Sequence, residues 1–342
     1  MARLTITPTV AEQASEIIIG HGLPEPLLPP RETRERTVVL LSPGASRPAA
    51  DAAARSGATD QFVLPDREEA KSLIVVSRVY EWLAELGLGR HDTILAVGGG
   101  AATDLAGFVA ATWLRGIEAV FYPTTLLGAV DAAIGGKTGI NFAGKNLIGS
   151  FHLPSRVLIN LDLLETLPPS LRLEGLAEAL KAGYVGDPYL VEMLASSGQD
   201  LSLGEVVERA VKVKAATVEA DFRESDRRAI LNFGHTVGHA VEILAPMPHG
   251  LAVAVGMVAA ATVSNARFGF DHRQLIETIF RLGLPVAAAG VSLDSALELI
   301  ARDKKRSNAG VRMVLLKAPG SPVVEAVSSD LLEVGLRAVG IA

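Results

Sequence analysis

In the first half of the chain, short apolar runs alternate with stretches whose apolar residues recur with the period of a helix. The runs at 37–41 (TVVLL), 93–97 (TILAV) and 119–122 (AVFY) are continuous, and a Gly or Pro turn follows each. This is typical of strands that are buried on both faces. The intervening stretches 68–86 and 104–114 have helical periodicity. Strand–helix alternation of this kind predicts a mostly parallel sheet covered by helices on both faces.

The pattern changes after about residue 160 and becomes almost entirely helical. The predicted helices cover 173–183, 203–220, 229–244, 251–268 and 271–282. Only 311–316 (VRMVLL) has the composition of a strand. The sequence therefore predicts an α/β domain over residues 1–160 and a mainly helical domain over residues 161–342.

Composition narrows the classes of function. The length of 342 residues suits two domains, and 49% apolar residues supply a core. A net charge of −6 argues against a nucleic-acid surface, which needs a basic stripe, although a basic pocket can lie inside an acidic protein. The absence of cysteine excludes disulfides, thiolate zinc sites and cysteine nucleophiles. Any metal must be bound by His, Asp or Glu, which favours a Lewis-acid ion over a redox cluster.

The sequence carries no pattern of export or membrane insertion. Residues 1–20 lack a charged segment followed by an apolar run. The longest apolar stretch, 251–263, contains a glycine and is too short to cross a bilayer. We therefore expect a cytoplasmic protein with no membrane partner and no nucleic-acid partner.

A triple glycine lies between a predicted strand and a predicted helix at 95–104 (LAVGGGAATD). Glycines there let backbone N–H groups approach a phosphate, and the start of the helix favours its negative charge. The run is not the GxGxxG fingerprint, so a tight strand–helix turn with Asp104 as an N-terminal cap is the alternative.

A second glycine-rich segment, 131–138 (DAAIGGKT), resembles a P-loop but lacks its first glycine, because Asp131 occupies that position. The segment carries Lys137 and is soon followed by Lys145 and Asn146. Two lysines in one glycine-rich region favour an anionic ligand, whereas a single lysine would usually be a solvated charge.

The helical half contains a polar stripe. Its members recur at i, i+4, i+7 and i+11, which predicts one face of one helix: Arg228, Asn232, His235 and His239. Burying such groups is costly unless they meet a ligand or a metal. Gly234 and Gly238 each cost about 1 kcal/mol of helix stability relative to alanine, which indicates a close approach to the backbone.

The same region holds candidate metal ligands. His235 and His239 form a helical HxxxH pair, but Thr236 stands where the HExxH motif has its glutamate. A third histidine, His249, follows a Pro-rich turn, and Glu178 lies with Lys181 at i, i+3 on a separate predicted helix. One carboxylate and two imidazoles would leave an open coordination position, as a catalytic metal needs. The basic residues are distant in sequence, and spacing does not decide whether they converge: Lys214, Arg228, Lys304 and Lys305.

Taken together, these motifs resemble the 3-dehydroquinate synthase family of the sugar phosphate cyclase superfamily. The resemblance covers most of the chain in ordered blocks: IIIGHGL at 17–23, LPDREEAKSL at 64–73, GGGAATDLAGFVAATWLRG at 98–116, PTTLLGAVDAAIGGKTGIN at 123–141, GKNLIGSFHLP at 144–154, AEALKAG at 177–183, ILNFGHTVGHAVE at 230–242, HGLAV at 249–253 and RDKK at 302–305.

The resemblance implies a Rossmann-like NAD-binding domain at 1–160, a helical metal- and substrate-binding domain at 161–342, a site in the cleft between them and a homodimer. It implies bound NAD and one divalent metal, Zn or Co, with Glu178, His235 and His249 as metal ligands. His239 is then a phosphate or proton-relay partner. Arg115 is implied to reach into the neighbouring subunit's site.

The remaining implied contacts fall into two sets. NAD contacts are implied for Asp66, Glu68, Lys71, Gly99, Gly100, Ala101, Ala102, Thr103, Asp104, Thr124, Thr125, Lys137, Lys145, Leu163 and Thr166. Substrate contacts are implied for Asp131, Lys137, Asn146, Lys181, Lys214, Arg228, Asn232, His239 and one or both of Lys304 and Lys305.

The implied reaction converts a seven-carbon keto-acid phosphate (DAHP) into 3-dehydroquinate and phosphate. NAD oxidises a secondary alcohol, the ketone acidifies the adjacent C–H, phosphate leaves, the hydride returns, and an aldol step closes the carbocycle. Because NAD is regenerated, the net reaction is a lyase reaction.

This chain departs from the family pattern at 42–44 (SPG), where an acidic residue often holds the adenosine ribose, at Arg67, which replaces a glycine, and at Leu251, where glutamate is common. Four other functions compete with the implied one: cyclisation of the amino analogue of DAHP, cyclisation of a sugar phosphate without a carboxylate, a polyol or glycerol-phosphate dehydrogenase, and an inactive binding protein. Arg228, His239 and the run 303–305 (DKK) favour an acid substrate.

Overall fold

The computed structural model describes residues 1–10, 13–29, 36–197, 201–303 and 310–342. The chain forms two compact units. The first contains Met1–Pro168 and Lys214–Arg223, and the second contains Pro169–Val213 and Glu224–Ala342. The assignment of NAD binding to one domain and metal and substrate binding to the other stays a prediction.

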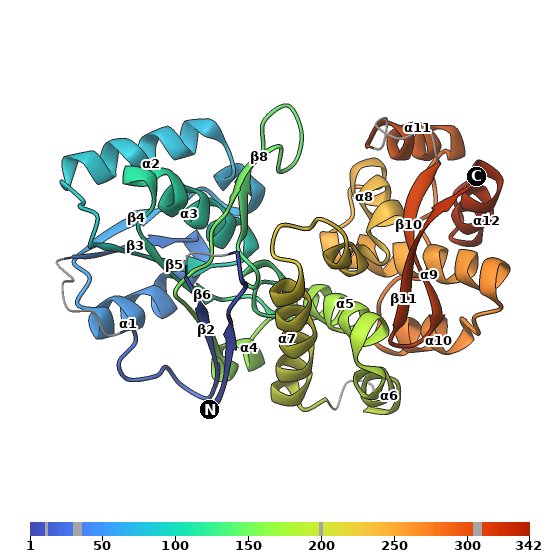
Figure 1. Cartoon of the computed structure of the whole chain (residues 1–342), viewed down its shortest axis with the longest axis horizontal. Helices are drawn as coiled ribbons and strands as arrows, with labels where there is room; N and C mark the ends of the chain where they lie inside the picture. Colours follow the sequence, from blue (N-terminus) through green and yellow to red (C-terminus); the bar gives the residue numbers. More distant parts are fainter. Residues whose placement is uncertain (11–12, 30–35, 198–200, 304–309) are drawn as a thin grey trace. The chain divides into compact units, whose positions relative to one another are not determined.

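The first unit is built on a seven-stranded sheet (Figure 1). In spatial order its strands are β1 (Ala2–Ile6), β2 (Ser15–Gly20), β9 (Arg156–Asn160), β6 (Glu118–Pro123), β5 (Thr93–Gly98), β3 (Thr37–Leu41) and β4 (Asp60–Val63). Only β1 pairs antiparallel, with β2, and the other neighbours run parallel. The predicted α/β class with a mostly parallel sheet is confirmed.

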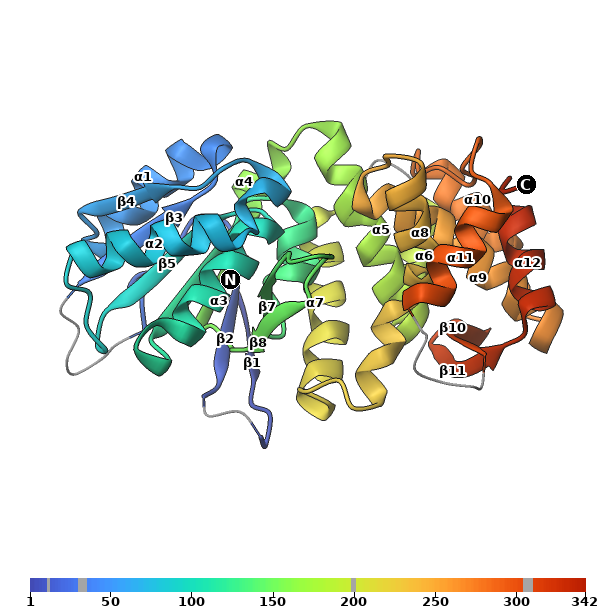
Figure 2. The same ribbon diagram turned by 90° about the horizontal axis from the view of Figure 1, so that it is seen from above.

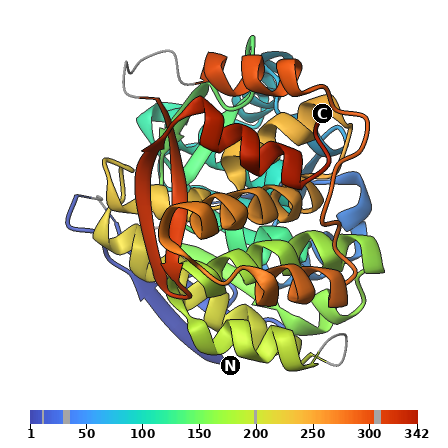
Figure 3. The same cartoon turned by 90° about the vertical axis from the view of Figure 1, so that its right-hand side faces the viewer.

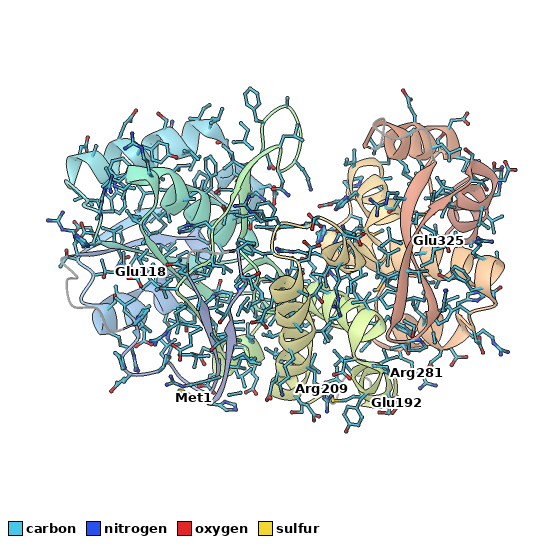
Figure 4. The ribbon with its side chains drawn as sticks, viewed as in Figure 1. Met1, Glu118, Glu192, Arg209, Arg281 and Glu325 are labelled. Carbon is cyan, nitrogen blue, oxygen red and sulfur yellow. The ribbon has the colours of Figure 1, made fainter. Side chains whose placement is uncertain are left out.

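The three predicted strands are confirmed as β3, β5 and β6, all inner strands of the sheet. Every residue in them is buried, as expected for strands covered on both faces. The polar Glu118 of β6 is buried too and accepts a hydrogen bond from Thr93 Oγ1 at 2.7 Å (Figure 4). The sequence pattern missed the remaining strands. For example, β4 (DQFV) is short, polar in part and alternates between partly buried and exposed positions.

Helices cover both faces of this sheet (Figures 1 and 2). The short α4 (Leu161–Glu165) and α1 (Ser46–Ser56) lie on one face, where Ala49, Val39 and Leu158 belong to one apolar cluster. On the other face lie α2 (Leu73–Glu85) and α3 (Gly100–Thr112). The predicted helix 68–86 is divided, because a 3₁₀ turn, η2 (Arg67–Ala70), comes before Ser72 caps α2.

Smaller elements complete the first unit. The turns are η1 (Pro43–Ala45), η3 (Trp113–Arg115) and the π-helical η4 (Gly128–Ala132), and the antiparallel hairpin consists of β7 (Lys137–Ile140) and β8 (Ile148–Phe151). The hairpin packs on α3, and a Cβ at Gly107 would lie 2.3 Å from Thr138 Cγ2. Glycine at this position therefore permits the contact.

The second unit is mainly helical (Figure 3). Its elements are α5 (Pro169–Gly186), α6 (Pro188–Ser197), the first part of α7 (Leu203–Ala220), η5 (Arg227–Asn232), α8 (His235–Leu244), α9 (His249–Phe268), α10 (Arg273–Arg281), α11 (Leu293–Asp303), the strands β10 (Val311–Ala318) and β11 (Ser321–Val327), and α12 (Ser329–Ala338). The predicted strand 311–316 is confirmed, but its partner β11 and the helices α6, α11 and α12 were not predicted.

Helix α9 is the centre of this unit and packs against α5, α8, α12 and β10. With 20 residues it is longer than the apolar run in the sequence, and by length and composition alone it could cross a membrane. Most of its apolar window is buried inside the protein, which is the pattern of a core helix. Polar contacts connect α6 to its neighbours, since Arg209 Nη1 of α7 donates to Asp187 Oδ2 at 2.9 Å and Arg281 Nη1 of α10 donates to the carbonyl oxygen of Ala195 at 3.1 Å (Figure 4).

The predicted continuous helix over 229–244 is wrong. The 3₁₀ turn η5 ends at Asn232, Phe233 is extended with ψ of 125°, and Gly234 has a φ of +82° before α8 begins at His235. Arg228 and Asn232 are therefore not on one helix face with the two histidines. The break has a packing cause, because the backbone of Gly234 lies directly against α9.

Candidate functional site

Three side chains that are far apart in sequence meet in the second unit. Glu178 comes from α5, His235 is the first residue of α8, and His249 is the first residue of α9. Glu178 Oε1 lies 3.6 Å from His235 Nε2 and 3.4 Å from His249 Nε2. The side chain of Glu178 is only 1% exposed. The three ligand atoms lie within 4.8 Å of one another, which is close enough for one metal ion.

Two glycines of α9 make this meeting possible. A Cβ at Gly250 would lie 2.3 Å from the carbonyl oxygen of Glu174, so α9 begins against the backbone of α5, one turn before Glu178. A Cβ at Gly256 would lie 1.9 Å from the carbonyl oxygen of Gly234. The close approach expected from glycine in this region is therefore real, and it is α9 that approaches the backbone of α8.

The second ring nitrogen of each histidine is engaged as well. His235 Nδ1 lies 3.3 Å from the carbonyl oxygen of Phe233, and His249 Nδ1 lies 3.3 Å from Glu242 Oε2. A carbonyl or an ionised carboxylate can only accept, so each Nδ1 carries the proton and donates it. Both rings consequently present Nε2 to Glu178.

The two histidines differ in proton affinity. Burial, with the nearby charge of Lys181, lowers the pKa of His235 to about 3, so this ring is neutral at physiological pH. Burial alone would also lower the pKa of His249, but its interactions with Glu178 and Glu242 outweigh burial and raise the pKa to about 10. Without a metal, His249 therefore holds a second proton that a metal ion would displace.

This donor set fits a divalent metal of borderline softness. One carboxylate oxygen and two imidazole nitrogens are typical of catalytic Zn²⁺ sites, in which a fourth position stays open for water or substrate. The buried ammonium of Lys181 forms an ion pair with Glu178 Oε2, the oxygen that does not face the histidines. Lys181 thus balances the charge of Glu178 while Oε1 faces both rings.

A cavity of about 250 Å³ lies beside the two histidines of α8 in the second unit. Asn232, His235 and His239 line one part of it, and Arg312 of β10 lines another. The His239 ring is 5.3 Å from the His235 ring, yet His239 is not part of the group whose ligand atoms lie within 4.8 Å of one another. His239 therefore lines the cavity without belonging to the candidate metal ligands, and its implied role as a phosphate or proton-relay partner stays a prediction.

Arg228 and Asn232 lie on η5, next to these histidines in sequence. Arg228 is the largest fully buried side chain of the described residues. Asn232 is exposed, and its Nδ2 donates to Glu224 Oε1 at 3.4 Å. A guanidinium keeps its charge even when buried, so Arg228 supplies a permanent positive charge to this part of the unit.

In the first unit, three of the residues implied to contact NAD form one network. Lys71 Nζ donates to Asp104 Oδ2 at 2.6 Å and to Asn146 Oδ1 at 2.5 Å. Asn146 N donates to Asn141 Oδ1 at 3.0 Å, and Asn141 Nδ2 donates to Glu68 Oε2 at 2.7 Å. Burial raises the pKa of Asp104, and the charge of Lys71 opposes that change. Asp104 belongs to the second turn of α3 and does not cap the helix, because Gly99 is the N-cap.

The glycine turn at 98–100 packs tightly against the end of β3 and against η4, and leaves no room for side chains. A Cβ at Gly98 would lie 2.3 Å from Ser42 Oγ, and a Cβ at Gly100 would lie 2.9 Å from Ala132 Cβ. Thr124 N donates to the carbonyl oxygen of Gly98 at 2.9 Å, which places the implied NAD residue Thr124 beside the turn. The turn therefore brings the N-terminus of α3 close to the end of β6, a geometry that suits a phosphate.

Lys214 pairs with Asp131 within the first unit. Its Nζ lies 2.5 Å from Asp131 Oδ1 and also donates to the carbonyl oxygen of Asp131. Both residues were implied to contact substrate, and the structure brings them together.

The other implied residues are placed individually. Ala101, Ala102 and Thr103 lie in the first turn of α3, Thr125 accepts from Gly128 N, Leu163 lies on α4, Thr166 follows α4, Asp66 precedes η2, Lys137 begins β7, Lys145 lies in the exposed turn before β8, and Arg115 ends η3 with a φ of +69°. Lys304 and Lys305 lie outside the described residues.

Sequence reasoning missed three residues of these sites: Asn141, Glu242 and Arg312. Asn141 and Glu242 each end a recognised block and Arg312 lies in the predicted strand 311–316, but isolated Asn, Glu and Arg side chains are most often solvated, so spacing alone gave no signal. Only the contacts described above single them out.

Comparison with known proteins decides the family. Residues 61–173 match the model of the 3-dehydroquinate synthase N-terminal domain, and residues 175–306 match the model of the C-terminal domain. The chain belongs to the 3-dehydroquinate synthase family. A 3-dehydroquinate synthase of Corynebacterium jeikeium (strain K411) is 41% identical over 352 residues, covering 96% of this chain and 95% of that protein.

Solved structures of other cyclases share the fold of this 3-dehydroquinate synthase family member. A 2-deoxy-scyllo-inosose synthase in complex with carbaglucose-6-phosphate, NAD⁺ and Co²⁺ is 25% identical, with a TM-score of 0.86 over 98% of this chain and 99% of that chain. A 2-epi-5-epi-valiolone synthase of Streptomyces hygroscopicus subsp. jinggangensis 5008 with NAD⁺ and Zn²⁺ is 26% identical, with a TM-score of 0.86 over 97% and 98%.

Proposed function

We propose that this chain is a 3-dehydroquinate synthase, which converts DAHP into 3-dehydroquinate and phosphate. The net reaction is that of a carbon–oxygen lyase acting on a phosphate ester. The observation that carries the proposal is the buried group of Glu178, His235 and His249, which lies beside a cavity lined by His239 and Asn232. The 41% identity to a named 3-dehydroquinate synthase over nearly the whole chain supports the choice of substrate.

Glu178, His235 and His249 would hold one divalent ion, Zn²⁺ or Co²⁺. Glu178 and His235 are buried and His249 is partly buried, and the engaged Nδ1 atoms leave Nε2 to face the ion. When bound, the metal supplies Lewis acidity toward hydroxyl and ketone oxygens, and NAD accepts and returns a hydride. The positions of the three ligands determine where the metal would lie, and therefore which hydroxyl and ketone oxygens of the substrate it would contact.

The polar residues around the cavity would bind the anionic groups of the substrate. Arg228 carries a permanent charge, and Asn232 and His239 offer donors at the cavity wall. Charge-assisted hydrogen bonds from such groups are about twice as strong as neutral ones. As an imidazole at the cavity wall, His239 would hold a proton for the departing phosphate. Asp131, Lys137, Asn146, Lys181, Lys214 and Lys304 or Lys305 complete the proposed substrate contacts.

The first unit would hold NAD. The N-terminus of α3 and the Gly98–Gly100 turn suit the pyrophosphate, and the network of Lys71, Asp104 and Glu68 fixes the polar wall beside it. Thr124 and Thr125 lie at the same edge of the sheet, after β6. Asp66, Lys137, Lys145, Leu163 and Thr166 are the further contacts that we propose.

We also propose that the protein is a cytoplasmic homodimer in which Arg115 acts in the partner's site. Arg115 and Leu114 are exposed and lie in a turn with positive φ at both residues, which leaves the Arg115 side chain accessible to a second copy of the chain. No membrane or nucleic-acid partner belongs to this function.

The test measures phosphate release from DAHP by metal-loaded protein with catalytic NAD, while the absorbance of NADH is followed in parallel. We expect phosphate over many turnovers without accumulation of NADH. Release from the amino analogue or from a sugar phosphate without a carboxylate, with none from DAHP, would instead assign a secondary-metabolism cyclase. Steady accumulation of NADH would contradict the proposal and assign a dehydrogenase.

A further inference from the structure

The ring of His249 lies between two carboxylates at its opposite nitrogen atoms. Nε2 faces Glu178 Oε1 at 3.4 Å, and Nδ1 faces Glu242 Oε2 at 3.3 Å. Glu242 is near the C-terminal end of α8, two turns after His235, and its side chain is only 14% exposed. Helix α8 therefore contributes one proposed metal ligand directly and contacts another through Glu242.

The partner of Nδ1 determines what Nε2 can do. An ionised carboxylate only accepts hydrogen bonds, so Nδ1 must carry the proton in the contact with Glu242. The lone pair of a neutral His249 ring is then on Nε2, on the side of Glu178. The same contact holds the ring plane, since a single χ2 rotation would break it.

His235 provides an internal comparison. Its Nδ1 donates to the carbonyl oxygen of Phe233, a backbone group fixed by the turn between η5 and α8. His249 begins α9 and is 28% exposed, against 11% for His235. The more exposed ring has less packing to hold it, so a side-chain carboxylate is needed to fix its orientation.

We propose that Glu242 is a positioning residue that fixes the tautomer and orientation of His249 for metal binding. The inference rests on the proposed metal site of Glu178, His235 and His249 and assigns to it a carboxylate outside the ligand set. Glu242 holds the His249 ring with Nε2 toward Glu178 and does not itself belong to the proposed ligand set.

The competing explanation is that Glu242 only ties α8 to α9. A structural ion pair of that kind would affect unfolding of the whole unit and would leave the coordination geometry of bound metal unchanged. The conservative variant Glu242→Gln separates the two, because its side-chain carbonyl still accepts from Nδ1 but carries no charge.

The experiment titrates Co²⁺ into metal-free full-length protein and records the visible absorption of the bound ion, its dissociation constant and its release to a chelator. The variants are Glu242→Ala and Glu242→Gln. The matched control is Glu333→Ala, which removes a carboxylate that pairs with Arg337 at 2.7 Å on α12 of the same unit. Thermal unfolding of each metal-free variant is measured in parallel.

We expect Glu242→Ala to weaken Co²⁺ binding about 10- to 100-fold, to speed its release and to change the visible spectrum. Glu242→Gln should restore most of the affinity and the wild-type spectrum, and Glu333→Ala should change neither. Unchanged affinity and spectrum in Glu242→Ala would overturn the role of Glu242. Equal loss of thermal stability in both Glu242 variants, with a wild-type Co²⁺ spectrum, would overturn it in favour of the structural ion pair.

These readouts keep the inference separate from the proposed function, because none of them requires turnover. If wild-type protein binds Co²⁺ with the expected dependence on Glu242 but does not release phosphate from DAHP, the proposed reaction fails and the role of Glu242 stands. If wild-type protein binds no Co²⁺, both fail together.

Discussion

Among the residues that the structure describes, two groups of histidine and acidic side chains are spaced closely enough to hold a metal ion, and their surroundings differ. The first is the buried group of Glu178, His235 and His249 in the second unit. The other, in the first unit, consists of His21, Asp162 and Glu165, all exposed, with their ligand atoms also within 4.8 Å of one another. Donor spacing alone therefore does not separate a metal centre from a surface cluster.

The difference lies in what surrounds the donors. In the exposed group, His21 and Asp162 are 67% and 57% exposed, and His21 Nδ1 is bonded directly to Asp162 Oδ1 at 2.7 Å. The other oxygen of Asp162 accepts from Gly22 N at 2.8 Å. The hydrogen bond with His21, then that with Gly22, lowers the pKa of Asp162. His21 and Asp162 are already hydrogen-bonded to each other and exposed to water, so an ion would gain little by replacing those contacts.

In the buried group, by contrast, helix packing holds the donors in place and the outer ring nitrogens are engaged away from the centre. Burying the carboxylate of Glu178 away from water is costly, and a bound divalent cation would offset that cost. The comparison teaches that burial and the partners of the donor atoms, more than their spacing, favour Glu178, His235 and His249 as the proposed metal site. The predictions below test this contrast, from the largest expected effect to the smallest.

Loss of a ligand in the buried group should abolish turnover. We expect Glu178→Gln and His235→Ala to lower phosphate release on the order of 1,000-fold or more, because Lewis-acid stabilisation is worth several kcal/mol. The fold should be largely retained, as circular dichroism would check. Full activity in either variant would refute the metal assignment.

A substitution that separates α9 from α8 should disrupt the arrangement of the three proposed metal ligands. In Gly256→Ala the new Cβ would lie 1.9 Å from the carbonyl oxygen of Gly234, so we expect destabilisation of about 3 kcal/mol or more. Urea denaturation measures this, and metal content should fall with it. Gly44→Ala is the control, because nothing lies within 4 Å of its Cβ. Similar stability for both variants would mean that the close packing of α8 on α9 is unimportant.

Loss of Lys137 should affect substrate and spare the metal. Lys137 begins β7 in the first unit and is exposed, so it is not among the proposed ligands. We expect Lys137→Ala to lower kcat/KM for DAHP roughly 100-fold, the order of magnitude for a lost charge-stabilising donor. Metal content, measured by atomic emission, should remain unchanged. An equal loss of both would indicate collapse of the fold and not loss of one contact.

Metal binding to the buried group should release a proton. With a pKa of about 10, His249 is protonated at pH 8, whereas His235, with a pKa of about 3, is not. Calorimetry of Zn²⁺ binding in two buffers of different ionisation enthalpy should therefore report about one proton released at pH 8 and none well above the His249 pKa. Zero release at pH 8 would contradict the assigned environment of His249.

The raised pKa of His249 also makes the stability of the metal-free protein depend on pH. The folded pKa of His249 is above its ordinary value of 6.5, so its contribution to stability is complete below that value and is lost as pH rises toward 10. The lowered pKa of His235 has its effect at acidic pH. As the pH falls from 6.5 toward 3, the unfolded state binds a proton that the folded state does not, so the free energy of unfolding decreases. The free energy of unfolding, measured by urea at several pH values, should follow both trends.

Changes in the exposed group should have the smallest effect. We expect His21→Ala to leave both metal content and turnover within twofold of wild type, since a solvated ion pair of this kind contributes little and lies outside the proposed site. The measurement repeats the metal analysis and the phosphate assay used for Glu178→Gln. A loss of bound metal in His21→Ala would remove the contrast between the two groups.

The long apolar patterns predicted the fold well. Central strands such as 93–97 and long helices such as 203–220 have enough periodic positions to define their type. Short edge strands did not, because β4 has two polar residues among four. The break at Phe233–Gly234 was also missed, because the helical period continues through it and only contact with α9 shows that the backbone must turn.

The sequence indicated which residue types could bind a metal, but it did not show which of these residues meet in the fold. The residue types at 178, 235 and 249 indicated a metal, but the choice of His249 over His239 came from the family resemblance and not from spacing. The packing of Gly250 on Glu174 and the contact of Glu242 with His249 could not be read from the sequence, since both depend on where α5, α8 and α9 meet.

A crystal structure of protein grown with Zn²⁺, with anomalous scattering recorded at the zinc edge, tests the central claim most directly. The account predicts one strong peak at about 2.0–2.2 Å from a Glu178 oxygen, His235 Nε2 and His249 Nε2, and no peak at His21 and Asp162. A peak at the exposed group alone, or coordination through His239 in place of His249, would contradict it.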